Sequence, residues 1–258
     1  MQTKHTFVIC AYGESPYLEQ CICSLKKQTV PVTILMATST PLDGVKKMAE
    51  KYDIPLYINT GEHGIAHDWN FAMSCADSEL VTIAHQDDYY EETFAETMQK
   101  SLQDDDLIGF TDYYEIRNGR KVEKNRLLRI KRILLTPLRF TRKNRFIRRR
   151  CLSFGNPICC PSVTYVMKNL EMPIFRQVFR SNIDWEAWER LAKLPGGFRY
   201  IHEHLTGHRI HEGSETSATI LEHLRTNEDL EMFRRFWPEW FARFINHIYA
   251  TAEKSNYV

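Results

Sequence analysis

The chain has 258 residues, of which 43% are hydrophobic, and a formal net charge of +1. These values are typical of a water-soluble globular protein of one large or two small domains, and no apolar stretch reaches the ~18 residues that cross a bilayer. Seven scattered cysteines, an odd number, argue against a secreted disulfide framework. The first residues lack the apolar core of a signal peptide, so we expect a cytoplasmic protein.

Apolar runs and amphipathic stretches alternate through the first hundred residues. Strands are predicted at 5–11, 32–37, 56–59 and 79–84, and helices from about Ser15, over 43–52, over 64–76 and from near Glu91. This alternation is typical of an α/β fold in which helices return the chain to neighbouring parallel strands. Because the carboxyl ends of parallel strands share one edge, residues 11–14, 38–40 and 87–88 are expected around one crevice.

The pattern changes after residue 104. A strand is predicted at 107–110, two basic helices broken at Pro137 over 123–150, a strand at 162–167, a helix at 182–194, strands at 198–201 and 205–210, and a helical tail over 219–254. No internal repeat and no low-complexity linker interrupts the chain, which favours a single compact unit.

Two adjacent carboxylates, Asp87 and Asp88, follow the buried strand at 79–84. Open α/β sheets bind ligands at this end of their strands, and hard oxygen donors suit Mg²⁺ or Mn²⁺ holding a phosphorylated substrate. Alternatively, the two Asp residues cap the helix that begins near Glu91. The tetrapeptide His85-Gln86-Asp87-Asp88 alone favours neither interpretation.

Four segments carry a family resemblance. They are residues 7–14 with the helix ending at 24–29; Gly64-Ile65-Ala66 with Asn70 and Ala72; His85-Gln86-Asp87-Asp88; and Ile183–Leu191. In this order they resemble the inverting family 2 glycosyltransferases of the GT-A fold, over residues 4–211. The third segment falls where the family has its Asp-x-Asp metal motif, and the fourth resembles the segment that carries the catalytic base.

The resemblance implies a Rossmann-like α/β fold with a mixed, mostly parallel sheet flanked by helices. It implies one GT-A-type domain over residues 1–258, in which 1–104 bind the nucleotide sugar. Residues 105–216 would form the acceptor half, including the basic helical segment 115–150, and residues 217–258 a C-terminal helical tail.

The activity that the resemblance implies is metal-dependent, inverting transfer of a sugar from a nucleotide-diphosphate sugar, above all a UDP-sugar. The acceptor would be a saccharide or a lipid-linked hydroxyl in surface glycan synthesis. Asp87 is expected as the main ligand of Mn²⁺ or Mg²⁺, with Asp88 and His211 as further ligands; Asp88 could instead orient the ligands. The cation would neutralise the diphosphate leaving group.

Asp184 matches the catalytic Asp of the family and would take the proton of the acceptor hydroxyl. The alternative is that Asp184 only caps its helix. Positions expected to contact the donor are Ala11, Tyr12, Glu14, Thr38, Asn70, His85, Gln86 and Arg209.

Several positions depart from the family pattern. His85 replaces the first Asp of the metal motif, and Thr38-Ser39-Thr40 replaces acidic residues that bind the base or ribose. Trp69 replaces an Arg; it could stack on an acceptor, but core packing is the more common use of a lone Trp on a helix. Ile183 replaces the Glu before the base, which raises the question of whether Glu186 shares the work. Since alternate residues of a strand face opposite sides, at most one of the histidines at 208 and 211 should reach the metal unless the strand has ended.

Residues 115–150 hold 15 Lys and Arg against the acids Glu115 and Glu123, so this segment carries +13 and the remainder −12. It could form a solvated helical hairpin that packs on the domain or on a second subunit, lie on an anionic membrane as a peripheral contact, or attract an acidic acceptor. No nucleic-acid partner is expected, because no aromatic platform accompanies the charge.

Two other functions stay open at this point. A nucleotidyltransferase of similar fold would carry a Gly-rich, basic loop after the first strand, whereas residues 12–16 are short and acidic. A non-catalytic nucleotide-sugar-binding protein is the other alternative, since the changed residues at 38–40 and 183 lie at expected site positions.

Overall fold

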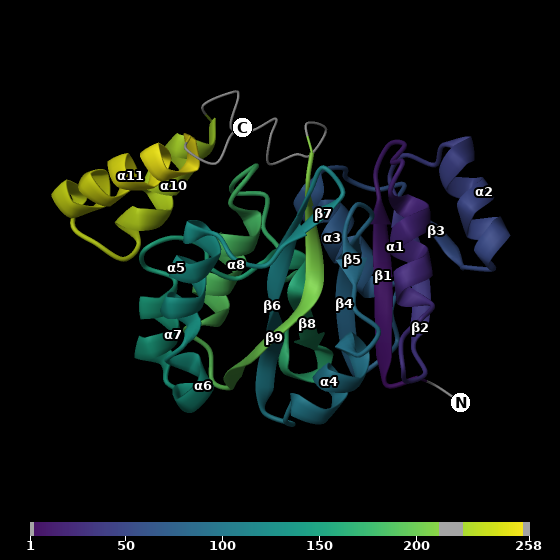
Figure 1. Ribbon diagram of the computed structural model, residues 1–258, viewed down its shortest axis with the longest axis horizontal. Coiled ribbons are helices and arrows are strands. Elements are labelled where there is room, and N and C mark those ends of the chain that lie inside the picture. Colours follow the sequence, from purple (N-terminus) through teal and green to yellow (C-terminus); the bar gives the residue numbers. More distant parts are fainter. Residues whose placement is uncertain (1–2, 212–223, 255–258) are drawn as a thin grey trace.

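The structure, a computed structural model, describes residues 3–211 and 224–254, which form a mixed sheet with helices on both sides (Figure 1). The first half contains β1 (His5–Ala11), α1 (Leu18–Leu25), β2 (Thr33–Thr38), α2 (Asp43–Tyr52), β3 (Leu56–Ile58), α3 (Ile65–Ser74), β4 (Leu80–His85), β5 (Tyr89–Tyr90) and α4 (Phe94–Ser101). The second half contains β6 (Asp106–Arg117), β7 (Arg120–Val122), α5 (Arg126–Leu135), α6 (Leu138–Thr141), α7 (Arg145–Cys151), β8 (Val163–Val166), α8 (Ile183–Leu191), β9 (Gly197–Ile210), α10 (Leu224–Arg234) and α11 (Glu239–Lys254).

The nine-stranded sheet has the order β3-β2-β1-β4-β8-β6-β9-β5, with β7 paired to β6. Strands β3, β2, β1 and β4 are parallel, β8 is antiparallel to both neighbours, and β6 runs parallel to β9. The short β5 pairs antiparallel with the end of β9, Tyr89 opposite Gly207. The turn between β4 and β5 is therefore held against the last residues of β9.

Strand β1 is buried at all but one of its residues and is apolar from Phe7 onward, because both faces of the sheet are covered at this point. Phe7 and Ile9 pack in a cluster with residues of α1, α2 and α4. Val8, on the opposite face, packs in a second cluster with residues of α3, α8, α10 and α11. The alternation along one strand thus fixes which helices lie on which side, and it leaves the polar residues after Ala11 at the open edge.

The predicted α/β architecture is confirmed, and most elements of the first hundred residues lie within three residues of their expected bounds. The helix over 43–52 has the predicted ends, and Leu18, Cys21, Ile22 and Leu25 form a buried apolar face on α1. Among the described helices, none has the length and apolarity to cross a membrane.

Three predictions for the second half were wrong in detail. The strand predicted at 107–110 continues to Arg117 and turns back as β7 through Asn118 and Gly119, which both have positive φ (49° and 75°). An Asn-Gly pair favours such a hairpin turn, so the start of the basic segment is strand.

The two strands predicted at 198–201 and 205–210 are one strand, β9, with a bulge where the register shifts from Ile201 to His204. The two helices predicted over 123–150 are three. The break at Pro137 is present, and a second one precedes Asn144, whose side chain caps α7 by accepting the N–H of Ile147 at 3.1 Å. Residues 219–223 of the predicted tail lie outside the described residues.

Candidate active site

The turn between β4 and β5 presents Asp88 to the end of β9. The side chain is 2% exposed, and its carboxylate accepts the backbone N–H of Arg209 at 2.8 Å and lies 3.1 Å from Nδ1 of His208. Burial alone would raise the pKa of Asp88, but the charge and hydrogen bond of His208 lower it overall. Asp88 is therefore an ionised carboxylate with its oxygens engaged by β9.

Asp87 is more exposed, and its two oxygens have different partners. The hydroxyl of Ser15 donates to Oδ1 at 2.5 Å, and Nε2 of His211 lies 3.1 Å from Oδ2. Because β9 ends one residue before His211, this side chain turns to Asp87 while His208, still within the strand, faces Asp88. Both histidines thus reach the aspartate pair, each at a different carboxylate.

Arg209, expected at a phosphate, is 7% exposed and engaged within the protein. Its Nε donates to the backbone oxygen of Asp87 at 2.8 Å, and Nη2 donates to the side chain of Gln20 at 2.6 Å. The guanidinium lies 4.1 Å from the ring centroid of Tyr17. In this arrangement Arg209 fastens the β4–β5 turn to α1.

The other two residues of the tetrapeptide contact β1 and α3. The amide of Gln86 pairs with the backbone of Tyr12, donating to its oxygen at 2.7 Å and accepting its N–H at 3.2 Å. The imidazole of His85 stacks on Trp69, with ring centroids 5.3 Å apart, and its buried Nε2 has no hydrogen-bond partner in the part of the chain that the structure describes. Burial lowers the pKa of His85, so the ring is neutral at pH 7 and has one buried polar atom that no described residue satisfies.

Two of the three predicted metal ligands, Asp87 and His211, are placed so that both can bind one divalent cation. Within residues 3–211 and 224–254, no three His, Cys, Asp or Glu side chains converge as a preformed cage. Asp87 and His211 nevertheless bring one carboxylate oxygen and one imidazole nitrogen within 3.1 Å of each other, which is close enough for both to bind one ion. Such an ion commonly takes its remaining ligands from water and substrate phosphates. Asp88, whose oxygens are already engaged, fits the alternative role of orienting the site.

A carboxylate that was not predicted from the sequence, that of Asp68, lies beside the end of β2. The hydroxyl of Ser39 donates to Oδ2 of Asp68 at 2.9 Å, and the amide of Asn59 donates to Oδ1 at 2.8 Å. Asp68 comes from the first turn of α3, and Asn59 follows β3. An acidic group is thus present beside the hydroxyls of residues 38–40, although α3 and not β2 supplies it.

The remaining residues expected to contact the nucleotide-sugar donor differ in their solvent exposure. Tyr12 is 69% exposed, Glu14 is also exposed, and Ala11 and Thr38 are buried at the ends of β1 and β2. Asn70 uses both atoms of its amide on the backbone of Phe175, at 2.8 and 3.0 Å, and so holds the segment before α8.

Asp184 lies in the first turn of α8. Its Oδ1 accepts the N–H of Trp185 and its Oδ2 accepts the side-chain amide of Asn156, both at 2.7 Å. Burial raises the pKa of Asp184 against these hydrogen bonds, and a carboxylate with a raised pKa is a stronger base. Glu186, one residue beyond Trp185, is buried and lies 3.3 Å from Nη1 of Arg235, so it is committed to an ion pair.

The aspartate pair and Asp184 belong to one region of the molecule. Burial, together with the charges of Asp88 and Asp184, raises the pKa of the thiols of Cys159 and Cys160, which lie within electrostatic reach of both carboxylates. The charge of Lys131 on α5 lowers the pKa of both Asp184 and His208, so Lys131 is also within electrostatic reach of both groups. The segment 159–160 and α5 thus border the metal-site candidate and the base candidate together.

Residues 6–174 match the sequence model of glycosyl transferase family 2. The chain belongs to this family. No curated protein sequence matches this glycosyltransferase. The family assignment confirms the resemblance found in the sequence and identifies the chain as a transferase enzyme.

Solved structures share the fold of this glycosyltransferase at low sequence identity. Residues 1–349 of TarS from S. aureus, in complex with UDP-GlcNAc, match with a TM-score of 0.63 and 15% identity over 95% of this chain and 70% of that chain. The mannosyltransferase PcManGT from Pyrobaculum calidifontis, in complex with GDP-Man and Mn²⁺, matches with a TM-score of 0.64 and 16% identity over 97% of this chain and 70% of that chain. At these identities the likeness establishes the GT-A fold.

Two site residues of the glycosyltransferase were not predicted from the sequence. Ser15 is the partner of Asp87, and Asn156 is the partner of Asp184. Ser15 lies just after β1, at the edge where ligands bind, and that position was a usable signal. Asn156 lies in the loop before β8 and carries no local pattern that links it to α8.

Proposed function

We propose that this chain is a metal-dependent, inverting glycosyltransferase that moves a sugar from a nucleotide-diphosphate sugar to a hydroxyl acceptor. The observation that carries the proposal is the contact of Asp87 with His211 at the carboxyl edge of the sheet, with Asp184 in the same region. Family membership supports glycosyl transfer, and the residues at this edge supply the groups that such chemistry needs.

Asp87 and His211 would hold Mn²⁺ or Mg²⁺, and Asp88 would keep the turn and His208 in position. A bound divalent cation would neutralise the negative charge that develops on the departing nucleoside diphosphate. His85 is neutral, and a hydroxyl or phosphate oxygen of the donor would supply the hydrogen-bond partner that its buried Nε2 lacks among the described residues.

Asp184 would act as the general base. Inversion by a single displacement needs one group that removes the acceptor proton as the hydroxyl attacks the anomeric carbon, and one carboxylate suffices. The hydrogen bonds from Asn156 and from the N–H of Trp185 hold both oxygens of Asp184 in place. Glu186 faces Arg235 and would not share this step.

A UDP-sugar is the proposed donor. TarS is in complex with UDP-GlcNAc and PcManGT with GDP-Man, so structures of this fold bind both kinds of donor. In this chain Asp68, with Ser39 and Asn59, would take the place of the acidic residues expected after β2 and hydrogen-bond to the ribose or base.

The proposed acceptor is a saccharide or lipid-linked hydroxyl in surface glycan synthesis, with the enzyme in the cytoplasm and at the inner face of the membrane. The charge of residues 115–150 supports a peripheral membrane contact. We propose no nucleic-acid partner.

Incubation of the protein with UDP- and GDP-sugars, Mn²⁺ and saccharide acceptors tests this function, with release of the nucleoside diphosphate and the anomeric configuration of the product as the readouts. We expect release that depends on Mn²⁺ and a product of inverted configuration. A product of retained configuration would contradict the role of Asp184. Formation of a nucleotide sugar from a nucleoside triphosphate and a sugar phosphate would identify a nucleotidyltransferase instead.

A further inference from the structure

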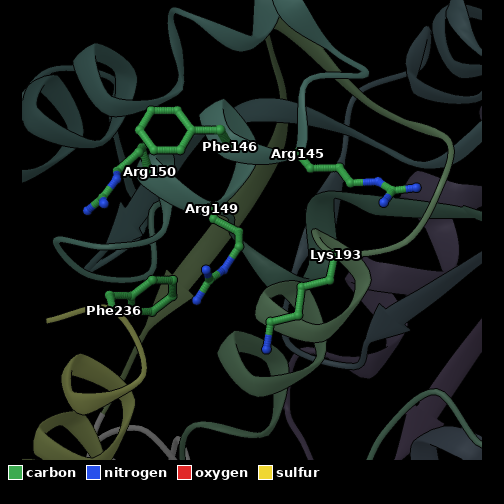
Figure 2. Close-up of a pocket in the computed structure, with 6 residues that line it drawn as sticks. All are labelled: Arg145, Phe146, Arg149, Arg150, Lys193 and Phe236. Atoms are coloured by element: carbon green, nitrogen blue, oxygen red, sulfur yellow. The ribbon is translucent and has the colours of Figure 1, made fainter.

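A basic cavity of about 330 Å³ lies between α7, the residues after α8 and the connection from α10 to α11. Figure 2 shows the side chains that line it, which are Arg145, Phe146, Arg149, Arg150, Lys193 and Phe236. None of these residues belongs to the candidate active site. Four cations and two aromatic rings, with no carboxylate among the lining side chains, indicate a site for an anionic ligand that also has an apolar part.

The charge of this cavity is only partly neutralised. The buried Glu189 pairs with Arg149 at 3.2 Å and with Lys193 at 2.7 Å. Arg145 and Arg150 are exposed and form no ion pair with any described residue. An excess of positive charge therefore faces the solvent at this point.

An aromatic surface continues from the cavity onto α11. The guanidinium of Arg150 lies over the rings of Phe146 and Trp237, 5.1 and 4.6 Å from their centroids. Trp237 contacts Phe241 at 4.9 Å between centroids, and Phe241 contacts its neighbours Trp240 and Phe244 on α11. The exposed fractions of Phe146, Trp240 and Phe244 are 64%, 73% and 57%. Large aromatic side chains gathered at this exposure mark an interaction surface.

The neighbouring helices extend the same character. Phe140 of α6 is 82% exposed and Ile133 of α5 is 68% exposed. Arg126 and Arg129, on the outer side of α5, are exposed and form no ion pair within the described ranges. Helices α5, α6 and α7 lie together on the flank of the sheet away from α1 and α2 (Figure 1).

We propose that the surface formed by α7, the α10–α11 connection and α11 binds an anionic lipid bilayer. The cavity would receive lipid headgroups, and Arg145 and Arg150, which point away from each other at opposite ends of the lining (Figure 2), would each contact the phosphate of a separate headgroup. Phe146, Trp240 and Phe244 would enter the interface of the bilayer, where Trp and Phe beside Arg are favoured. The membrane proposal rests on the proposed function in one respect: binding to a bilayer would bring a lipid-linked acceptor to the enzyme.

The positive charge of this surface favours a membrane, rather than a second copy of the chain, as its partner. A symmetric contact through this surface would set Arg145 and Arg150 against the same residues of the partner, with no free carboxylate among the cavity's lining residues to oppose them. An anionic bilayer supplies the opposite charge together with an apolar interior. It therefore matches both properties of the surface.

A flotation assay at low salt, without donor, acceptor or metal, tests the proposal. It compares vesicles of phosphatidylcholine alone with vesicles that also contain about 30 mol% phosphatidylglycerol, an anionic lipid. We expect the wild-type protein to float only with anionic vesicles. R145Q/R150Q should lower vesicle binding about tenfold or more. F146S/W240S/F244S should lower it similarly, because the apolar insertion is lost.

The matched control is K27Q/K47Q, which removes the same charge from exposed lysines after α1 and on α2, on the opposite flank. This variant should float like the wild type. Equal loss in K27Q/K47Q and R145Q/R150Q, or no flotation of the wild type, would overturn the proposal. The proposal would also be overturned if inorganic phosphate stabilised the wild type while anionic vesicles did not bind. A change in oligomeric state alone, measured by light scattering of F146S/W240S/F244S, would overturn it as well.

Circular dichroism melts identify any variant that fails to fold, and single substitutions of Arg145 and Trp240 then replace it. Transfer to a water-soluble acceptor is measured in parallel. Absence of flotation of the wild type, with transfer intact, contradicts the membrane surface alone, whereas flotation without any transfer contradicts the proposed function alone.

Discussion

Nε2 of His211 lies 3.1 Å from a carboxylate oxygen of Asp87, although 124 positions separate the two residues in the sequence. The contact exists because β5, directly after the aspartate turn, pairs with β9 just before that strand ends. The sheet thereby brings one oxygen and one nitrogen donor together at the edge where α/β proteins bind ligands.

His211→Ala should weaken metal-dependent binding of a nucleoside diphosphate by roughly tenfold or more, because one of two proposed ligands is lost. Calorimetric titration of UDP with and without Mn²⁺ measures this effect. The matched control is His202→Ala, since His202 lies earlier on β9 and contacts Asp112 instead. Equal binding by His211→Ala and the wild type would remove His211 from the site.

Asp184→Asn should lower the transfer rate by roughly 10²–10⁴-fold, the usual contribution of a general base. The thermal stability of the Asp184→Asn variant should equal or exceed that of the wild type near neutral pH, at about pH 7 to 8. Burial raises the pKa of Asp184 in the folded state, so the folded protein holds this proton more tightly than the unfolded chain. The free energy of unfolding therefore falls as pH rises from the pKa of Asp184 in the unfolded chain through its higher pKa in the folded state, and Asn abolishes this penalty. A transfer rate like that of the wild type would exclude Asp184 as the base.

Asn156→Ala should move the acid limb of the kcat/KM profile to higher pH. The Asn156 amide donates to the Asp184 carboxylate and lowers its pKa, so its removal leaves the effect of burial less opposed. Asn169→Ala serves as the control, because Asn169 donates to backbone oxygens of Asp104 and Asp106 away from the site. An unshifted limb, with transfer retained, would mean that another group sets it.

Asp68→Asn and Ser39→Ala should each lower the affinity for the preferred nucleoside diphosphate about tenfold, the order expected for a lost hydrogen bond to a charged group. Competition between UDP and GDP measures whether selectivity falls as well. Ser74→Ala, at the other end of α3, is the control, since its hydroxyl donates only to the backbone of Phe71. Unchanged affinity in both variants would place the nucleotide elsewhere.

The positions of Asp87 and Asp184 could be predicted from sequence because each depends on a local pattern, a short apolar strand in one case and an amphipathic helix with Trp185 and Trp188 in the other. His211 was expected beside Asp87 only through the family resemblance, because the contact itself requires the two-residue β5 and the bulge in β9. Asp68 was missed for a similar reason: its partners Ser39 and Asn59 follow two other strands.

The charge of the basic segment was visible in composition, but its distribution was not. Arg142 pairs with Asp105 and Asp106, and Arg132 lies 3.6 Å from Asp112, so part of the +13 is neutralised inside the fold. The cations left for a partner are concentrated on the outer sides of α5 and α7. The contribution of α11 to the same surface depends on rings that meet only in the folded chain.

The central claim is a nucleotide-diphosphate donor bound with a divalent cation at Asp87 and His211. Thermal shifts across a panel of nucleoside mono-, di- and triphosphates, with and without Mn²⁺ or Mg²⁺, test it most directly. We predict that one nucleoside diphosphate raises the melting temperature only when the cation is present, and that Asp87→Asn abolishes this shift. The absence of a cation-dependent shift with every nucleoside diphosphate would contradict the account.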